Sequence, residues 1–138
     1  MSRELQATDD FYVNITLDNL RLELYNTAGT HFPSDSAHGA LALNTRSSWA
    51  ITYDDQGDRL PPIYKNGQEV AYDTDHTAVT GTYKTLTTPI RVGNDAPGDR
   101  PFQGVIDSVR MDDRVLAIDE IKARSASVRH VAASESTE

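Results

Sequence analysis

Apolar and polar residues alternate along three stretches of the chain, at residues 11–16, 20–25 and 48–54. A period of two places successive side chains on opposite faces, so each stretch is expected to form a strand with one buried face. The pair Asp18-Asn19 separates the first two stretches. Both residue types favour turns, so the pair predicts a hairpin. The chain therefore begins like a meander of antiparallel strands.

The third stretch and the segment after it predict a further hairpin. Trp49 shares a face with Ile51 and Tyr53, and we expect this face to lie in the core. Asn66-Gly67 then lies between two short strand-like runs. Asn-Gly is the strongest local signal for a type I′ hairpin, because both central residues need a positive φ.

The rest of the chain shows weaker patterns. The expected strands are 40–43, 85–92 and 103–111, and the expected loops are 26–37, 71–81 and 93–101. A short helix is expected from near Ala117, with Ile118 and Ile121 facing inward. From Ser125 the periodicity ends, and the polar composition is that of a disordered tail. The expected organisation is a lead-in at 1–10, one domain at 11–124 and a polar tail at 125–138.

An ordered set of short motifs runs through residues 39–124. These motifs are Trp49, Tyr53-Asp54, Tyr64-Lys65-Asn66-Gly67, Gly104-Val105-Ile106-Asp107-Ser108-Val109-Arg110, and Leu116 with Glu120-Ile121. In this order and spacing they resemble the second half of a laminin-G-like domain of the concanavalin A-like superfamily. The resemblance implies an all-β, antiparallel jelly-roll β-sandwich with one short C-terminal helix. It also implies recognition or adhesion, without naming a ligand.

The same resemblance implies an incomplete sheet. In laminin-G-like domains, opening strands precede the matched region, and one of them pairs with the strand equivalent to 104–111. Residues 1–10 could supply one such strand at most. We therefore expect an open strand edge at 104–111 or at the neighbouring 11–16 strand. Open edges invite pairing with another chain. The expected partner is a second copy or another structural protein.

Composition narrows the class of partner. The chain has 138 residues, enough for one domain with a core, and its formal net charge is −8. This charge argues against nucleic acid and anionic membranes, which need basic patches. No apolar run approaches the roughly 18 residues that span a bilayer, so no membrane insertion is expected. Without cysteine, disulfides and thiolate chemistry are excluded. Residues 1–10 show no signal peptide, so the expected location, an extracellular surface or a virion, requires assembly, lysis or fusion.

Catalytic patterns are missing from the sequence. Glucanases of the same superfamily use two glutamates around an aspartate on one strand, with retaining chemistry needing carboxyls about 5 Å apart. No two glutamates here are two or four residues apart with an aspartate between them. Ser47-Ser48 has no nucleophile elbow, and His31 and His38 lack the spacing of a metal pair. We therefore expect no enzyme activity.

Calcium is the one cofactor that the sequence suggests, and no cofactor is certain. Oxygen-rich clusters occur at Asp54-Asp55 with Asp58, at Asp73 with Asp75, and at Asn94-Asp95 with Asp99. Ca²⁺ takes oxygen ligands in flexible loops, which makes Asp73, Asp75 and Asp95 the candidate metal ligands. Aspartate and asparagine are also the usual residues of solvated turns, and this alternative stays open.

A ligand surface, if present, is expected on these loops. Its candidate ligand-binding residues are Tyr72, Asp73, Asp75, Asn94, Asp95 and Arg100. The rings of Tyr64, Tyr72, Tyr83 and Phe102 could form a platform for a sugar or could fill the core. Asp107 falls on the apolar face of the 103–111 strand, where we expect a structural role and a partner such as Arg91 or Arg110.

Two functions remain at this point. The first is a non-catalytic recognition and assembly module within a larger surface structure, such as a virion decoration, a fibre or a cell-surface assembly, binding protein or glycan. The alternative is a free-standing, calcium-dependent carbohydrate-binding domain of the lectin type.

Overall fold

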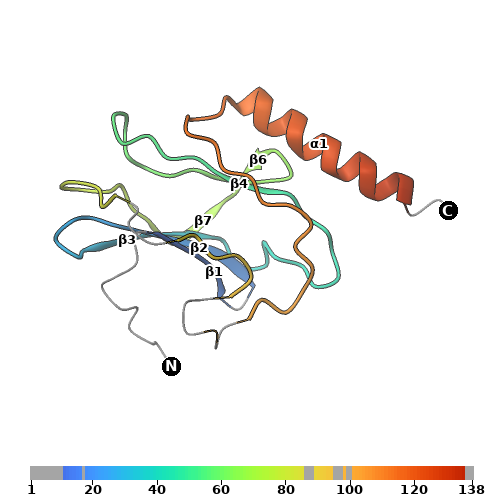
Figure 1. Cartoon of the computed structure of the whole chain (residues 1–138), viewed down its shortest axis with the longest axis horizontal. Coiled ribbons are helices and arrows are strands. Elements are labelled where there is room, and N and C mark those ends of the chain that lie inside the picture. Colours follow the sequence, from blue (N-terminus) through green and yellow to red (C-terminus); the bar gives the residue numbers. More distant parts are fainter. Residues whose placement is uncertain (1–10, 17, 86–88, 95–97, 99–100, 136–138) are drawn as a thin grey trace.

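The computed structural model covers the whole chain and describes residues 11–16, 18–85, 89–94, 98 and 101–135. Within these ranges it forms β1 (Phe11–Thr16), β2 (Asn19–Tyr25), β3 (His31–Ser36), β4 (Trp49–Ile51), β5 (Ile63–Lys65), β6 (Gln68–Glu69), β7 (Tyr72–His76) and α1 (Ile118–Glu135). One sheet has the order β1-β2-β3-β7 and the other has the order β4-β5-β6. All paired strands are antiparallel. Figure 1 shows the two sheets as separate layers, with α1 beside the smaller one. The predicted all-β sandwich with a C-terminal helix is confirmed.

The first hairpin forms as the alternation predicts. Val13 pairs with Leu22, and Thr16 pairs with Asn19, so the chain reverses between these last two residues. Asp18 lies in the turn as expected, whereas Asn19 already belongs to β2. On β2, the alternate residues Leu20, Leu22 and Leu24 are all buried.

The core lies where the larger sheet faces the smaller one. Leu22, Leu24, Phe32 and Val79 form a buried cluster. Phe11, Ile51, Tyr53 and Tyr83 pack against it, and among them Ile51 belongs to the smaller sheet. Trp49 is outside this cluster and is only partly buried, with the Nζ atom of Lys65 5.8 Å from its ring centre. The expectation that Trp49 lies in the core is therefore wrong.

Two segments predicted as loops contain strands. β3 lies within 26–37 and β7 within 71–81. The Ser, Pro and Asp residues of β3 gave it a loop-like composition, but Ser34 and Ser36 are fully buried. The backbone N–H of Leu20 donates to Ser36 Oγ at 2.9 Å. Pro33 has no N–H to donate to the ladder, but its carbonyl still accepts a bond from Thr77 N at 3.1 Å, close to the irregular stretch of the β3–β7 pairing.

Three predicted strands do not form in the described part of the chain. These are 40–43, the described residues of 85–92, and 103–111. Leu43 is 93% exposed, so the first segment has no apolar surface to cover it. Alternation of apolar and polar residues indicates that a segment could form a strand. Its backbone N–H and C=O groups also need a neighbouring strand with which to form hydrogen bonds. None of the three segments pairs with a described strand; the 40–43 segment has one long-range backbone bond, from Leu41 N to Asp18 O at 2.9 Å.

The helix begins as predicted but continues further. α1 starts at Ile118 and buries Ile121, whereas Ile118 is 41% exposed rather than facing inward. The helix runs to Glu135, so the expectation of a disordered tail from Ser125 is wrong over this range. Its first turn is fixed by Glu120, whose Oε2 accepts from Ala117 N at 3.1 Å. The two bonds from Arg114 to Glu120 lower the pKa of this carboxyl to about 2.

α1 packs against the hairpin between β5 and β6. Lys65 pairs with Gln68, and the φ angles of Asn66 and Gly67 are 51° and 81°. Both angles confirm the predicted type I′ turn. A Cβ atom added at Gly67 would lie 3.0 Å from the Cα atom of Lys122 in the helix. Glycine is thus required at position 67 for two reasons: the turn needs a positive φ, and the helix leaves no room for a Cβ atom.

This double requirement makes Gly67→Ala a sharp test. A left-handed alanine costs about 1–2 kcal/mol, and overpacking adds about 1–3 kcal/mol. We expect the free energy of unfolding to fall by about 2–4 kcal/mol in urea melts. Gly29 also has a φ of 81° but would place its Cβ in open space, so Gly29→Ala should show the smaller backbone cost alone. Equal losses in the two variants would contradict the helix contact.

Candidate functional site

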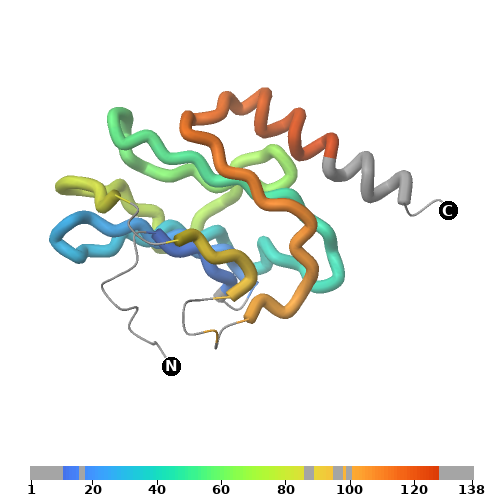
Figure 2. The backbone as a smooth tube through the Cα atoms, in the orientation of Figure 1, coloured from blue at the N-terminus to red at the C-terminus, as the bar shows by residue number. Residues whose placement is uncertain are grey.

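The expected ligand-binding residues are spread over the molecule. Tyr72, Asp73 and Asp75 lie on β7, an edge strand of the larger sheet. Asn94 lies in another segment, where its Nδ2 donates to Gly98 O at 3.1 Å. Asp95 and Arg100 lie outside the described residues. In Figure 2 the loop at 54–58 and the chain at 93–94 are on different sides of the molecule. The described parts of the three predicted loops therefore do not converge.

Tyr72 connects the two sheets. Its hydroxyl accepts a hydrogen bond from the backbone N–H of Ile63 at 2.9 Å and donates to Glu69 Oε1 at 2.9 Å. Its ring centre is 3.5 Å from that of His76. Burial raises the pKa of the Tyr72 phenol well above its usual value. The hydroxyl thus already has two protein partners, and its role in ligand binding stays a prediction.

A charged cluster occupies the face of the larger sheet that points away from the core. Arg21 Nε donates to Asp35 Oδ1 at 2.7 Å, and this pairing raises the pKa of Arg21. Asp75 and Glu23 each lie 3.6 Å from the Arg21 guanidinium. The hydroxyl of Tyr25 donates to Glu23 Oε2 at 2.9 Å. Asp35 and Glu23 are only 4% and 3% exposed, so these bonds offset the cost of burying two carboxylates.

Sequence reasoning missed this cluster. Arg21, Glu23 and Tyr25 alternate with the leucines of β2, which signals a polar face, but the composition of 26–37 predicts a loop at Asp35. Only the pairing of Arg21 with Asp35 across β2 and β3 brings the two charges together.

A second charged group joins three segments of the chain. His38 Nδ1 lies 2.7 Å from Asp18 Oδ1, and His38 Nε2 lies 3.4 Å from Asp73 Oδ2. The backbone N–H of Gly39 donates to Asp18 Oδ2 at 2.9 Å. Hydrogen bonding between the two side chains raises the pKa of His38 and lowers the pKa of Asp18. The group links the β1–β2 turn, the chain after β3, and β7.

The calcium prediction gains no support from this geometry. The carboxylate of Asp73 faces His38, and that of Asp75 faces Arg21. Within the described part of the chain, no three His, Asp or Glu side chains gather in a way that could hold a metal ion. Asp95, the third expected ligand, lies outside it. Calcium binding stays a prediction.

Asp107 is placed differently from the prediction. It is exposed, and its Oδ2 lies 3.0 Å from Arg46 Nη1. The expected buried position and the expected partners, Arg91 or Arg110, are both wrong. The reason is that 103–111 does not enter the sandwich as a strand, so its alternation has no inner face.

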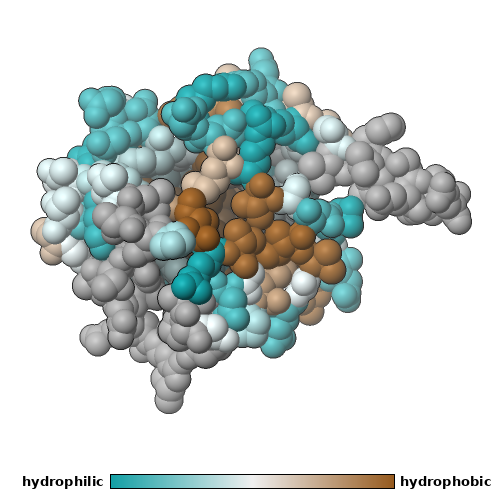
Figure 3. Space-filling model, in the orientation of Figure 1, coloured by the Kyte–Doolittle hydropathy of each residue, from teal (hydrophilic) through white to brown (hydrophobic). Residues whose placement is uncertain are grey.

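Residues 103–111 form the most apolar exposed segment of the described chain, which we call the strip. Val105 is 84% exposed, and Ile106, Val109 and Met111 are 43%, 57% and 56% exposed. Figure 3 shows an apolar area over this part of the chain. No backbone hydrogen bond joins residues 103–116 to another residue that the structure describes. The strip therefore offers both apolar side chains and unused backbone groups.

The inner face of the larger sheet is also partly uncovered. Val13 and Ile15 share a face with the buried leucines of β2, yet they are 43% and 42% exposed. β1 is an edge strand of its sheet. The sandwich is thus closed over β2 and β3 and open toward β1.

Comparison with known proteins identifies the family. A model of the concanavalin A-like lectin/glucanases superfamily matches residues 3–122. The chain belongs to this superfamily. The laminin-G-like resemblance inferred from Trp49, the Asn66-Gly67 hairpin and the 104–110 motif is thereby confirmed. The superfamily includes binding proteins and hydrolases, so membership alone does not choose between them.

Other comparisons are sparse. No curated protein matches the chain. A similar solved structure is that of an S-layer domain-containing protein (residues 221–444) from Clostridium thermocellum, with 21% sequence identity and a TM-score of 0.48. The match covers 78% of this chain and 51% of the other, so this chain spans about half of that structure's length. Separately, among the described residues no helix has the length and apolar character of a membrane span.

The inter-sheet role of Tyr72 can be tested by Tyr72→Phe. Ile63 is fully buried, and its N–H loses its partner in this variant. A buried unsatisfied donor costs about 1–3 kcal/mol, which should appear as a lower free energy of unfolding in urea. The hydroxyl of Tyr53 instead donates to the exposed Asp55. Tyr53→Phe should therefore cost less than about 0.5 kcal/mol, and an equal loss would contradict the link.

The His38 group predicts a pH dependence. Because the folded-state pKa of His38 is raised above 6.5, its stabilisation is complete below pH 6.5 and is lost as pH rises through the raised pKa. The lowered pKa of Asp18 makes its contribution vanish as pH falls below 3.8. Asp73 and, at longer range, Asp35 also favour the His38 cation. An NMR titration should show a lower His38 pKa in Asp18→Asn and no change in the control Asp113→Asn. An unchanged titration in Asp18→Asn would refute the pairing.

Proposed function

We propose that this chain is a non-catalytic recognition and assembly module, which pairs its exposed strip with an extended segment of another polypeptide. The observation that carries the proposal is the strip itself. Val105, Val109 and Met111 are more than half exposed, and the backbone around them has no partner among the described residues. Apolar side chains beside unpaired N–H and C=O groups are the features that β-strand addition uses.

The strip is held in place at both ends. At one end, the backbone N–H of Phe102 donates to Gly93 O at 2.7 Å. Near the other end, Arg124 of α1 donates to the two carboxylate oxygens of Asp112 at 2.7 and 3.2 Å. In the middle, Arg46 holds Asp107. An extended segment that is already ordered loses less conformational entropy on pairing, which favours binding.

Hydrolysis has less support. Glu23 is 3% exposed and bonded to Tyr25, and Glu120 is bonded twice to Arg114. Glu69 accepts from the Tyr72 hydroxyl. These three described glutamates are therefore engaged in structural contacts. The calcium-dependent lectin alternative also has less support, because Asp73 faces His38 and Asp75 faces the Arg21 guanidinium. A glycan ligand and a location on a cell surface or a virion stay predictions.

The proposal predicts binding that depends on the strip. The probes are the chain itself and two peptides of about ten residues, the upper end of the usual strand length, that alternate Val with Glu or Val with Lys. We expect association with at least one probe, measured by light scattering for the chain and by fluorescence anisotropy for the peptides. Val109→Asp should weaken that association by about tenfold or more, because burying a valine contributes about 1.5–3 kcal/mol.

Leu43→Asp provides the matched control. Leu43 is 93% exposed and lies outside the strip, so this variant makes the same kind of change elsewhere on the surface. It should leave the association unchanged. The proposal fails if none of the three probes associates with the chain, or if Val109→Asp and Leu43→Asp behave alike.

A further inference from the structure

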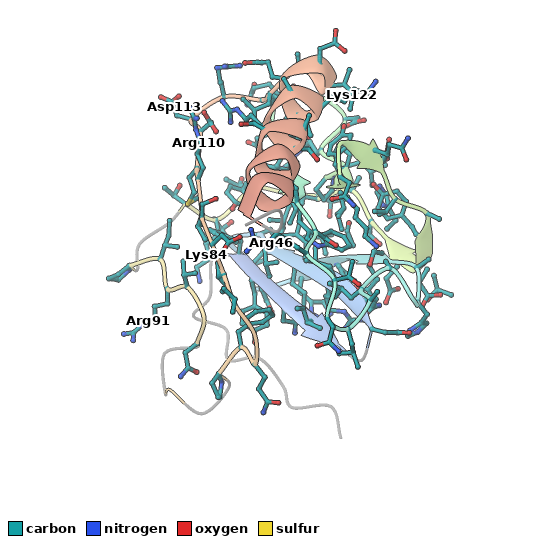
Figure 4. The ribbon with its side chains drawn as sticks, turned by 90° about the vertical axis from the view of Figure 1, so that its right-hand side faces the viewer. Arg46, Lys84, Arg91, Arg110, Asp113 and Lys122 are labelled. Atoms are coloured by element: carbon teal, nitrogen blue, oxygen red, sulfur yellow. The ribbon has the colours of Figure 1, made fainter. Side chains whose placement is uncertain are left out.

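Cationic side chains gather on the side of the molecule that carries the strip. Figure 4 shows Arg46, Lys84, Arg91 and Arg110 on this side. The chain as a whole has a formal net charge of −8, so this side differs in charge from the average of the molecule. Apolar exposure and positive charge therefore coincide at one surface.

Two carboxylates beside the strip are already paired, whereas Asp113, next to Arg110 in Figure 4, has no ion pair with a described residue. Asp107 is bound by Arg46, and Asp112 is bound at two points by Arg124. Arg110 reaches Asp112 only at 3.5 Å and is 69% exposed. Because Asp112 is shared with the closer Arg124, Arg110 keeps most of its capacity to pair with an incoming carboxylate.

Arg91 adds a second available cation next to the strip. It is exposed, and within the described ranges no carboxylate is in ion-pair contact with it. Two residues further on, the carbonyl of Gly93 accepts from Phe102 N at 2.7 Å. A Cβ atom built on Gly93 would be 3.9 Å from the Cδ1 atom of Ile106. The chain that carries Arg91 therefore runs beside the start of the strip.

The positive charge of Arg91 and Arg110 beside the strip favours some strand partners over others. A second copy that paired strip to strip would bring Arg110 and Arg91 of both molecules to the same interface, and bringing like charges together at an interface is destabilising. A strand with alternating apolar and acidic residues would instead cover Val105 and Val109 while it supplies carboxylates to the arginines. Complementary charge at the rim of an interface sets specificity and speeds association.

We infer that the strip accepts an extended segment of another polypeptide in which apolar residues alternate with Asp or Glu. This inference rests on the proposed function and adds the chemistry of the partner. Arg91 and Arg110 discriminate between strands by charge, and the apolar residues of the strip bind any strand of suitable shape.

The test compares three fluorescent peptides by anisotropy. The first alternates Val with Glu, the second alternates Val with Lys, and the third has the composition of the first with its Glu and Val residues in separate blocks. The full chain should bind the alternating acidic peptide about tenfold more tightly than the basic one. The block peptide should bind more weakly, because its valines cannot all face one side. The preference should shrink at high salt.

A charge reversal completes the test. The double variant Arg91→Glu/Arg110→Glu should reverse the preference and bind the basic peptide more tightly. The control Arg59→Glu changes a charge in a different loop and should keep the preference, with folding of both variants checked by circular dichroism.

Equal binding of the two alternating peptides, or a preference that survives the double variant, would overturn the inference and leave the proposed function standing. Equal binding of the block peptide would show unspecific attraction and overturn it too. If no peptide binds and the chain does not self-associate, both fail.

Discussion

The pairing of β2 on both of its edges is the constraint on which the rest of this structure depends. β2 is bonded to β1 on one side and to β3 on the other. Its leucines provide much of the buried cluster beneath the smaller sheet. Its opposite face carries the partly exposed Arg21, which pairs with the buried Asp35 of β3, and the buried Glu23, which accepts from the Tyr25 hydroxyl. One strand thus fixes both an apolar layer and a charged layer, and the neighbouring strands supply the partners for each.

The second half of the described chain is held by a different kind of contact. Arginine and carboxylate pairs, rather than a backbone ladder, attach 107–114 to the rest: Arg46 with Asp107, Arg124 with Asp112, and Arg114 with Glu120. Exposed ion pairs contribute little to stability individually, but a bidentate arginine contact fixes geometry. The result is a segment whose path is defined while its backbone groups stay available for pairing. A strand built into the sheet would not leave those groups available.

The concanavalin A-like sandwich of this chain has one closed side and one open side. The described sandwich is well packed over β2 and β3, and it is open at β1 and along the strip, where Val13 and Val105 are exposed. Large exposed apolar areas are uncommon on isolated soluble domains and usually mark sites of interaction. The proposed assembly role uses the open side, and the polar clusters around Arg21 and His38 stabilise the closed side.

The sequence by itself determined the elements whose signals are local. Alternation was sufficient for β1 and β2, because a two-residue period needs no partner to be recognised. Asn66-Gly67 was sufficient for its turn, because few other pairs adopt two positive φ angles. The order of the motifs between Trp49 and Ile121 was sufficient for the superfamily.

The tertiary structure alone decided which potential strands were used. β3, with its Pro, Ser and Asp residues, became a strand because β2 offered a paired edge and a space small enough for two buried serines. The strip has a far better strand pattern, yet it pairs with no described strand and stays outside both sheets. The same reason explains the site residues. Asp35 meets Arg21 and His38 meets Asp18 only through pairings between distant parts of the chain, and sequence spacing cannot reveal those contacts.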